Sequence, residues 1–315
     1  MQIARKMVAS RICDAIAAIG YTAASAVMDI VDNSISAEAK NITIKINLAE
    51  GKTYAERTNI FSVLIIDDGK GMDDEGVLTA LDIGSIQSYP DNSLSKYGFG
   101  LKSAGFSLGP KISILSKKNK KFSKLYSVDK RTLGEEYLIN SEDSGKSIDD
   151  LKELLKGSSG TIVEISGCDD KNHDSAKRTV DALVERLGVT YCYYLSRENS
   201  PINISLECTN RPIITVTPRD ILHRDNCIEQ FDKDSYDCTQ PILRKDVEIA
   251  ISENADDPPL KLEVVLFPPK KIISHPNLPD ETKEKIKLYD VSRKNKGFFI
   301  YRNEALLHKR SLNSL

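Results

Sequence analysis

The sequence predicts an α+β fold, on the strength of three patterns. Residues 26–37, AVMDIVDNSISA, space their apolar side chains as one helical stripe. ITIKINL (42–48) alternates strictly between apolar and polar residues, and FSVLIID (61–67) is a largely apolar run that ends in an acid. These two patterns are typical of a half-buried and a buried strand. The length of 315 residues exceeds one typical domain, so we expect two domains.

The other elements of the first domain follow from the same kinds of pattern. We expect a helix over 4–19 that Gly20 ends, and a second helix over 22–36 with Thr22 or Ser25 near its start. After the glycine turn DDGKGM, acidic residues suit the start of a helix over 73–81. The remaining predicted helices are 101–108, 148–156 and 174–196, and the remaining predicted strands are 111–117, 122–128, 135–140, 160–165, 202–207 and 212–216.

The pattern of residues along the chain changes after about residue 222, so we place the domains at 1–222 and 223–315. In the second domain, strand patterns cover VEIAIS, LKLEVVLF and GFFIYRNEALL, and ETKEKIK predicts a short helix. The turns ADDPP and FPPKK separate these elements.

Composition and charge limit the classes of function. The net charge of −2 gives the whole molecule no strong attraction to nucleic acid. The lysine run KKNKKFSK (117–124) could contact phosphate, although a solvated hairpin turn is the favoured interpretation. No apolar run could span a bilayer, and the six cysteines form no CxxC pair, so we expect a cytoplasmic protein with free thiols. His223, Cys227 and Cys238 could be imagined as zinc ligands, but a fourth ligand is missing.

Polar residues on the helix 22–36 form the first segment suited to chemistry. Asp29 and Asn33 are four residues apart, so they lie one turn from each other on one face. An amide oxygen suits a hard cation such as Mg²⁺, and a carboxylate one turn earlier could take a proton from an attacking water. Taken alone, this segment could equally be an ordinary surface helix.

The second segment is IIDDGKGMD (65–73). Asp67 ends a buried strand, where a carboxylate needs a donor partner such as an adenine amino group. Gly69 and Gly71 would let the backbone turn sharply and approach a flat ring. A plain strand–turn–helix connection would also explain this segment.

The third segment is KYGFGLKSAGFS (96–107), which follows a long polar loop, 84–100. Gly98 and Gly100 precede a helix, whose first amide groups can bind phosphate, and Lys102 adds a positive charge. The segment is neither a P-loop nor a Rossmann fingerprint. A flexible glycine hinge is the alternative.

The order and spacing of these segments resemble the GHKL ATPases, which include gyrase B subunits, MutL proteins, heat-shock-ninety chaperones and histidine kinases. GTIVEI (160–165) is similar to the later glycine–threonine strand of that family. The resemblance covers roughly residues 4–220 and is closest to the MORC- and MutL-like branch, in particular its bacterial ATP-binding proteins. GFFIYRN resembles a strand of the ribosomal-S5-type transducer domain that such proteins carry.

The resemblance implies a Bergerat-fold α/β sandwich, with a mixed, mostly antiparallel sheet and helices on one face, followed by an S5-like transducer domain. The chain stops soon after GFFIYRNEALL, whereas a transducer domain should run longer, so we expect either a truncated second domain or a short member of the family. ATP and Mg²⁺ are the implied cofactors. Carried over from the family, Asp29 is the general base, Asn33 binds Mg²⁺ and Asp67 reads adenine. The other implied ATP contacts are Gly69, Gly71, Met72, Gly98, Phe99, Gly100, Leu101, Lys102 (also catalytic) and Thr161.

One departure from the family pattern affects the rate. Many members carry glutamate where this chain has Asp29, and the aspartate carboxylate is set back by one carbon–carbon bond. A displacement of about 1 Å can cost about 10²-fold in rate, so we expect slow hydrolysis.

The resulting hypothesis is an ATP-gated switch. The 84–100 loop would close over the triphosphate, two chains would pair, and hydrolysis would reopen the loop. A lysine of the second domain would reach the γ-phosphate, with Lys270, Lys271, Lys294 and Lys296 as candidates. By analogy, the role lies in DNA processing or phage defence, and DNA is a candidate partner. The alternatives are a non-hydrolysing ATP-binding scaffold or chaperone-like clamp, and a histidine-kinase-type protein kinase.

Overall fold

The computed structural model describes residues 8–18, 20–83, 100–170, 173–199, 201–229, 234, 237–250, 252, 259–289, 297–302 and 304–311. The chain divides into two compact units, Met1–Pro218 and Arg219–Leu315. Each unit is described by itself below. Across the described helices, none combines the length and apolar character that crossing a bilayer requires.

One mixed sheet organises the first unit. Within the described residues it has nine strands, with the order β6-β5-β3-β7-β2-β1-β8-β9 and β4 paired to β3. The pair β1–β8 is parallel, and the other pairs are antiparallel. The strands are β1 Asn41–Leu48, β2 Ile60–Asp67, β3 Lys111–Lys118, β4 Lys121–Phe122, β5 Leu125–Asp129, β6 Asn140–Glu142, β7 Gly160–Ser166, β8 Asn203–Cys208 and β9 Ile214–Thr215. The predicted α+β class with a mostly antiparallel sheet is confirmed.

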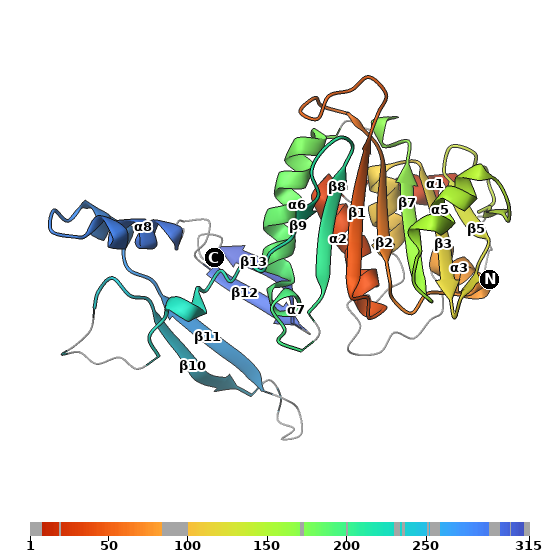
Figure 1. Ribbon diagram of the computed structural model, residues 1–315. Helices are drawn as coiled ribbons and strands as arrows, with labels where there is room; N and C mark the ends of the chain where they lie inside the picture. The colour runs from red at the N-terminus through yellow and green to blue at the C-terminus, as the bar shows by residue number, and fades with distance from the viewer. Residues whose placement is uncertain are drawn as a thin grey trace, which may run out of the picture. The chain divides into compact units, whose positions relative to one another are not determined.

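A helical layer covers one face of this sheet (Figure 1). The helices of the unit are α1 Ala9–Ala17, α2 Ala23–Ser36, α3 Asp74–Leu81, α4 Gly100–Leu108, α5 Lys146–Leu154, α6 Ala176–Thr190 and α7 Cys192–Leu195, with a 3₁₀ turn η1 at Cys168–Asp170. Because side chains alternate along a strand, Ile42, Ile44 and Ile46 of β1 all face one side, and all are fully buried. Helix α2 packs against α4, α6 and β2, which makes it the central helix of the layer.

The short helix α5 packs apart from this layer. Its Ile148 and Leu151 join a buried apolar cluster with Leu64 of β2, Leu115 of β3 and Ile162 of β7. These strand residues alternate with those that face α2, so they lie on the opposite face of the sheet. Figure 1 shows α5 on the side of the sheet away from α2.

The predicted strand 135–140 is wrong for most of its length, because its backbone and side chains serve the ends of two helices instead. The carbonyl of Glu135 accepts from the amide of Ala9 at 3.1 Å, at the start of α1. The Tyr137 hydroxyl donates to the carbonyl of Leu81 at 2.7 Å, at the end of α3. Helix ends leave such groups unsatisfied, and here tertiary contacts satisfy them. Only Asn140 begins a strand, β6.

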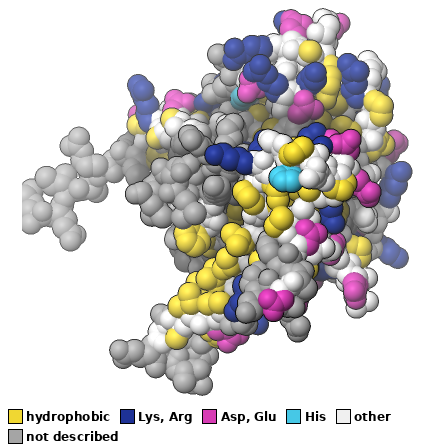
Figure 2. All heavy atoms as spheres, turned by 90° about the vertical axis from the view of Figure 1, so that its left-hand side faces the viewer, with side chains coloured by type: hydrophobic (Ala, Val, Ile, Leu, Met, Phe, Trp, Pro, Cys, Tyr) yellow, Lys and Arg dark blue, Asp and Glu magenta, His cyan; other side chains and the backbone are white. Residues whose placement is uncertain are grey.

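Two antiparallel hairpins and one helix make up most of the described part of the second unit. The elements are η2 Arg224–Asn226, β10 Ile242–Ile249, β11 Leu260–Leu266, η3 Lys270–Ser274, α8 Asp280–Leu288, β12 Gly297–Arg302 and β13 Ala305–Ser311. β10 pairs with β11, and β12 pairs with β13. Several apolar side chains of β10 and β11, including Leu260 and Leu266, are exposed. Figure 2 shows hydrophobic side chains gathered on one face of the molecule. The predicted S5-like identity of this unit stays a prediction.

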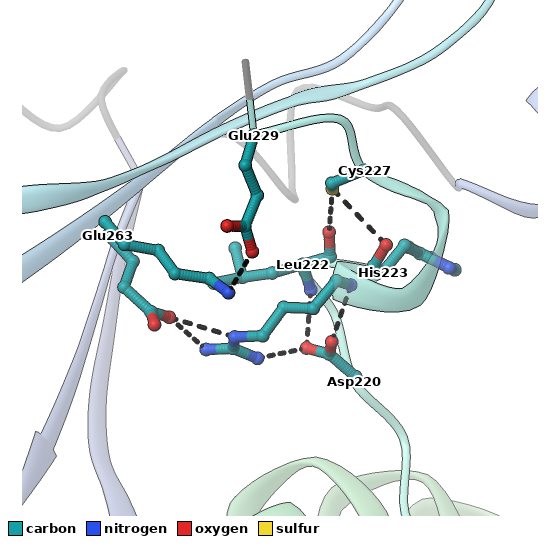
Figure 3. A network of polar contacts seen from close by, with 8 residues as sticks. Asp220, Leu222, His223, Cys227, Glu229 and Glu263 are labelled. Carbon is teal, nitrogen blue, oxygen red and sulfur yellow. Dashed lines mark hydrogen bonds and ion pairs between the residues drawn. The ribbon is translucent and has the colours of Figure 1, made fainter.

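Arg224 bonds both Asp220, near the beginning of the second unit, and Glu263 of β11 (Figure 3). The Arg224 guanidinium donates to Asp220 through Nη1 at 2.5 Å and to Glu263 through Nε at 2.9 Å and Nη2 at 2.5 Å. A paired guanidinium fork of this kind holds both carboxylates in fixed directions.

Candidate functional site

The last residue of β2 carries a buried carboxylate, as the sequence predicts. Asp67 is 6% exposed, and its Oδ1 accepts from the amide of Gly69 at 2.9 Å. Its Oδ2 accepts from the Ser34 hydroxyl of α2 at 2.8 Å. Burial raises the pKa of Asp67, while these hydrogen bonds lower it. A carboxylate has about four acceptor positions, so these two contacts leave capacity for a ligand donor.

Two neighbouring strands extend this polar position into a row. Thr161 of β7 lies directly opposite Asp67, and Ser116 of β3 lies directly opposite Thr161. Residues opposite each other in an antiparallel ladder point to the same face, so all three face α2. The hydroxyls of Ser116 and Thr161 are 2.9 Å apart, and the Met72 amide donates to Ser116 Oγ at 2.8 Å. The predicted residues Asp67, Met72 and Thr161 therefore meet at one end of the sheet.

The glycines that follow Asp67 have a packing reason of their own. Gly71 has φ of +66°, and a Cβ there would lie 1.9 Å from the carbonyl oxygen of Lys117 on β3. A Cβ on Gly69 would lie 2.8 Å from the carbonyl oxygen of Ala37. The turn therefore needs glycine to pass close to neighbouring backbone. This requirement holds whether or not a flat ring packs on Gly71.

Helix α2 presents its acids in different surroundings. Thr22 caps its start, accepting from the Ser25 amide at 3.2 Å, while the Ser25 hydroxyl accepts from the Thr22 amide at 2.9 Å. Asp32 accepts from the Tyr191 hydroxyl at 2.5 Å, and Tyr191 is fully buried. This pair satisfies the polar group that the apolar helix face would otherwise leave unpaired. Asp32 therefore anchors α2 within the unit.

Asp29, the predicted base, is half-buried. Its Oδ2 accepts from the Tyr21 hydroxyl at 2.5 Å. Burial raises the pKa of Asp29, and the Tyr21 hydrogen bond and the charge of Arg186 lower it. A carboxylate whose pKa moves up toward neutrality is better suited to accept a proton.

Asn33 lies one turn after Asp29 on the same helix. Its Nδ2 donates to the Asp29 carbonyl at 3.4 Å, so its amide oxygen points away from that carbonyl. An oxygen donor on a half-buried amide fits a Mg²⁺ ligand, since Mg²⁺ takes few protein ligands and keeps several waters.

Lys102 lies in the first turn of α4, but its side chain is turned inward. The residue is 2% exposed, and its Nζ donates to the Ala80 carbonyl of α3 at 3.0 Å. Burial lowers the pKa of Lys102 to about 8, and Asp82 opposes this shift. Gly100 begins α4, and a Cβ there would meet no atom of the described residues within 4 Å, so packing against them does not require glycine at this position. Leu101, the next predicted contact, is half-buried.

Several predicted residues lie outside the described part of the chain. Gly98, Phe99 and the loop residues 84–99 are among them, as are Lys294 and Lys296. Lys270 and Lys271 are exposed on η3 of the second unit. Their predicted roles stay predictions.

The alternative zinc site has other contacts in the structure. Cys227 donates its thiol hydrogen toward the carbonyls of Leu222 and His223, at 3.5 and 3.3 Å (Figure 3). The His223 ring packs edge-on against Phe267 and Tyr289. Searching the described residues finds no group of three or more His, Cys, Asp and Glu side chains that could hold a metal ion.

Sequence reasoning missed three residues of this site. Ser34 bonds Asp67, Ser116 connects Met72 to β7, and Tyr21 bonds Asp29. Ser116 could have been identified from the sequence, because it is a polar residue in the apolar strand KISILSK. Tyr21 could not, since its hydrogen-bond partner depends on how the chain enters α2.

A comparison with known families agrees with this geometry. Residues 21–161 match the model of the family described as histidine kinase-, DNA gyrase B-, and HSP90-like ATPase. The match covers α2, the Asp67 turn, α4 and the beginning of β7. It supports a GHKL-type ATPase domain that binds ATP in the first unit, and the sheet with its helical layer is consistent with the Bergerat-type fold of that family. No curated protein matches the chain.

Proposed function

We propose that the first unit binds ATP with Mg²⁺ and hydrolyses it, with the adenine at Asp67 and the phosphates at the start of α4. The observation that carries this proposal is the buried Asp67 carboxylate, held by Ser34 and Gly69 on the sheet face that α2 covers. Burying a carboxylate costs free energy unless hydrogen-bond donors satisfy its oxygens. The adenine amino group could donate to an acceptor position of Asp67 that Ser34 and Gly69 leave open.

The proposed chemistry needs a base near the phosphates, and α2 supplies it. Asp29 and Ser34 are five residues apart, which is about 7–8 Å along a helix axis. In the proposed reaction, a water oxygen attacks the γ-phosphorus, the bond to the bridging β–γ oxygen breaks, and Asp29 takes the proton of the water. Asn33 would hold Mg²⁺, which when bound neutralises phosphate charge.

The first test replaces the proposed base. Asp29→Asn keeps the size of the side chain but removes its capacity to take a proton, so turnover should fall by at least about 10²-fold. ATP affinity measured by calorimetry should stay within about threefold of the wild type, because Asp29 lies away from Asp67. Steady-state phosphate release measures the rate. Turnover that survives in this variant rules out Asp29 as the base.

The same two assays, together with a test for transfer of labelled phosphate to the protein, separate hydrolysis from the alternatives. Wild-type protein that binds ATP in Mg²⁺ buffer without releasing phosphate would favour the ATP-binding scaffold or clamp. Labelled phosphate retained on the protein would favour a kinase.

The resemblance to the MORC- and MutL-like branch also motivates three further parts of the proposal. They are closure of the 84–100 loop, ATP-dependent pairing of two chains, and a role in DNA processing or phage defence. Sedimentation with a non-hydrolysable ATP analogue tests pairing, and a protein that stays monomeric with analogue bound removes it. Phosphate release with and without DNA tests the DNA role.

A further inference from the structure

Tyr21 lies near both the proposed base, Asp29, and α4, the helix at whose start the phosphates are proposed to bind. Its hydroxyl donates to Asp29 Oδ2 at 2.5 Å, a short distance for a hydrogen bond between two side chains. The Ser103 side chain of α4 lies close enough to this hydroxyl to lower its pKa, against the effect of burial. The Ser103 hydroxyl donates to the carbonyl of Gly100, the first residue of α4, at 3.0 Å. Tyr21 therefore lies between Asp29 and the first turn of α4.

We infer that Tyr21 is a positioning residue that holds the Asp29 carboxylate in its reactive orientation relative to α4. This inference rests on the proposed ATPase function. The Tyr21 hydroxyl engages Oδ2 of the carboxylate and so fixes its rotation about the last side-chain bond. Fixing that rotation matters more for an aspartate, because its short side chain has little reach with which to follow a displaced water.

The backbone around Tyr21 is itself held in place. Tyr21 immediately precedes Thr22, and Thr22 and Ser25 form reciprocal hydrogen bonds at the start of α2. Arg186 of α6 also approaches Thr22, with its Nη1 3.5 Å from the Thr22 hydroxyl. A tyrosine has two side-chain torsions, so a fixed backbone leaves its hydroxyl a narrow range of positions.

The contact between Tyr21 and Asp29 gives the inference a measurable consequence. The Tyr21 hydroxyl is bonded to Oδ2 of the carboxylate. Removing that hydroxyl takes away a constraint on the rotation of the carboxylate, so the chemical step should slow while nucleotide binding changes little. A change in kcat without a change in ATP affinity therefore distinguishes positioning from a general loss of structure.

The chain offers a matched control for this test. Tyr191 also donates its hydroxyl to an α2 aspartate, Asp32, at the same distance of 2.5 Å. Asp32 is not the proposed base. Tyr21→Phe and Tyr191→Phe therefore remove the same chemical group from the same helix, and only the first touches the base.

The experiment compares kcat, ATP affinity, the ¹³C carboxyl signal of Asp29 at one fixed pH, and the melting temperature in the wild type and both variants. Tyr21→Phe should lower kcat roughly tenfold to a hundredfold, since hydrogen bonds to charged groups are among the stronger ones, while ATP affinity stays close to that of the wild type. In the nucleotide-free protein, the ¹³C carboxyl signal of Asp29, assigned with Asp29→Asn, should move in Tyr21→Phe because the hydrogen bond to Oδ2 is lost. Tyr191→Phe should lower the melting temperature and leave both kcat and that signal close to those of the wild type.

The outcomes separate the inference from the function beneath it. An Asp29 carboxyl signal that is identical in the wild type and Tyr21→Phe would overturn the contact. A moved signal with unchanged kcat would overturn its catalytic importance. Wild-type protein that binds ATP without turning it over would overturn the proposed hydrolysis, and with it the role of Tyr21, even if the carboxyl signal moves.

Discussion

Lys102 offers a quantitative test, because its ammonium group is buried and burial disfavours the charged form. The residue is 2% exposed, donates to the Ala80 carbonyl at 3.0 Å, and has a pKa lowered by burial to about 8. The perturbation is Lys102→Met, which keeps the length and flexibility of the side chain and removes the charge and the donor.

The expected change in stability follows from two opposing effects. The fall in pKa from 10.5 to about 8 corresponds, at about 1.4 kcal/mol per pH unit, to about 3 kcal/mol by which burial penalises the charged form near pH 7. The lost hydrogen bond to Ala80 offsets about 1 kcal/mol of the gain. Lys102→Met should therefore raise the free energy of unfolding by about 2 kcal/mol, or the melting temperature by roughly 5 °C.

The pH dependence provides a second signature. Between pH 8 and 10.5 the unfolded chain keeps the Lys102 proton that the folded protein has lost, so wild-type stability should rise with pH through this interval. That rise should be smaller in Lys102→Met. Lys118→Met is the matched control, because the Lys118 side chain is 47% exposed and paired with Asp73 at the surface. It should change stability by no more than about 0.5 kcal/mol.

The assay is urea unfolding followed by circular dichroism at pH 7, 9 and 10. A Lys102→Met protein that is less stable than the wild type at pH 7 would refute the reasoning, as would an undiminished rise in stability with pH. The variant should also bind ATP more weakly, since it lacks the charge proposed to meet the phosphates. The wild-type lysine would then lower the stability of the protein but strengthen ATP binding.

The remaining predictions concern the two ends of the nucleotide site. Gly71→Ala should destabilise the protein by at least about 2 kcal/mol in thermal unfolding, because φ is +66° and the new Cβ would meet the Lys117 carbonyl at 1.9 Å. Gly100→Ala should keep wild-type stability, because its Cβ would meet no described residue within 4 Å. It should weaken ATP binding in calorimetry, because phosphate is proposed to lie there, and unchanged affinity would contradict the phosphate assignment. Asp67→Asn should weaken ATP binding at least roughly tenfold in the same calorimetry, and wild-type affinity would remove Asp67 as the adenine acceptor.

Local patterns in the sequence were enough to predict the elements that carry the site. The helix predicted over 22–36 is observed at Ala23–Ser36, and the strand predicted over 61–67 is observed at Ile60–Asp67. In both, the apolar spacing agrees with the face that is buried, so local sequence and tertiary packing favour the same structure. Asp67 was placed correctly at a strand end because an acid that closes an apolar run is visible without any knowledge of the fold.

What could not be predicted depends on strand register and on contacts between distant segments. Ser116 and Thr161 meet Asp67 only because β3, β7 and β2 align in one register, which single strands do not encode. The predicted strand 135–140 had a suitable composition, but Tyr137 bonds the end of α3 instead of continuing a ladder. Tertiary contacts override local preference in such segments.

The polar residues of α2 can now be assigned to separate tasks by their partners. Asp32 is bonded to the buried hydroxyl of Tyr191, and Ser34 is bonded to Asp67. These two contacts hold the helix against α6–α7 on one side and against the sheet on the other, so they fix its rotation about its own axis. Asp29 is three residues before Asp32, and a helix turns about 100° per residue, so the direction of Asp29 is set by the same contacts. Loss of the Tyr191 hydroxyl should therefore lower stability by loosening the hold on α2 as a whole, whereas loss of the Tyr21 hydroxyl acts directly on the carboxylate of the proposed base.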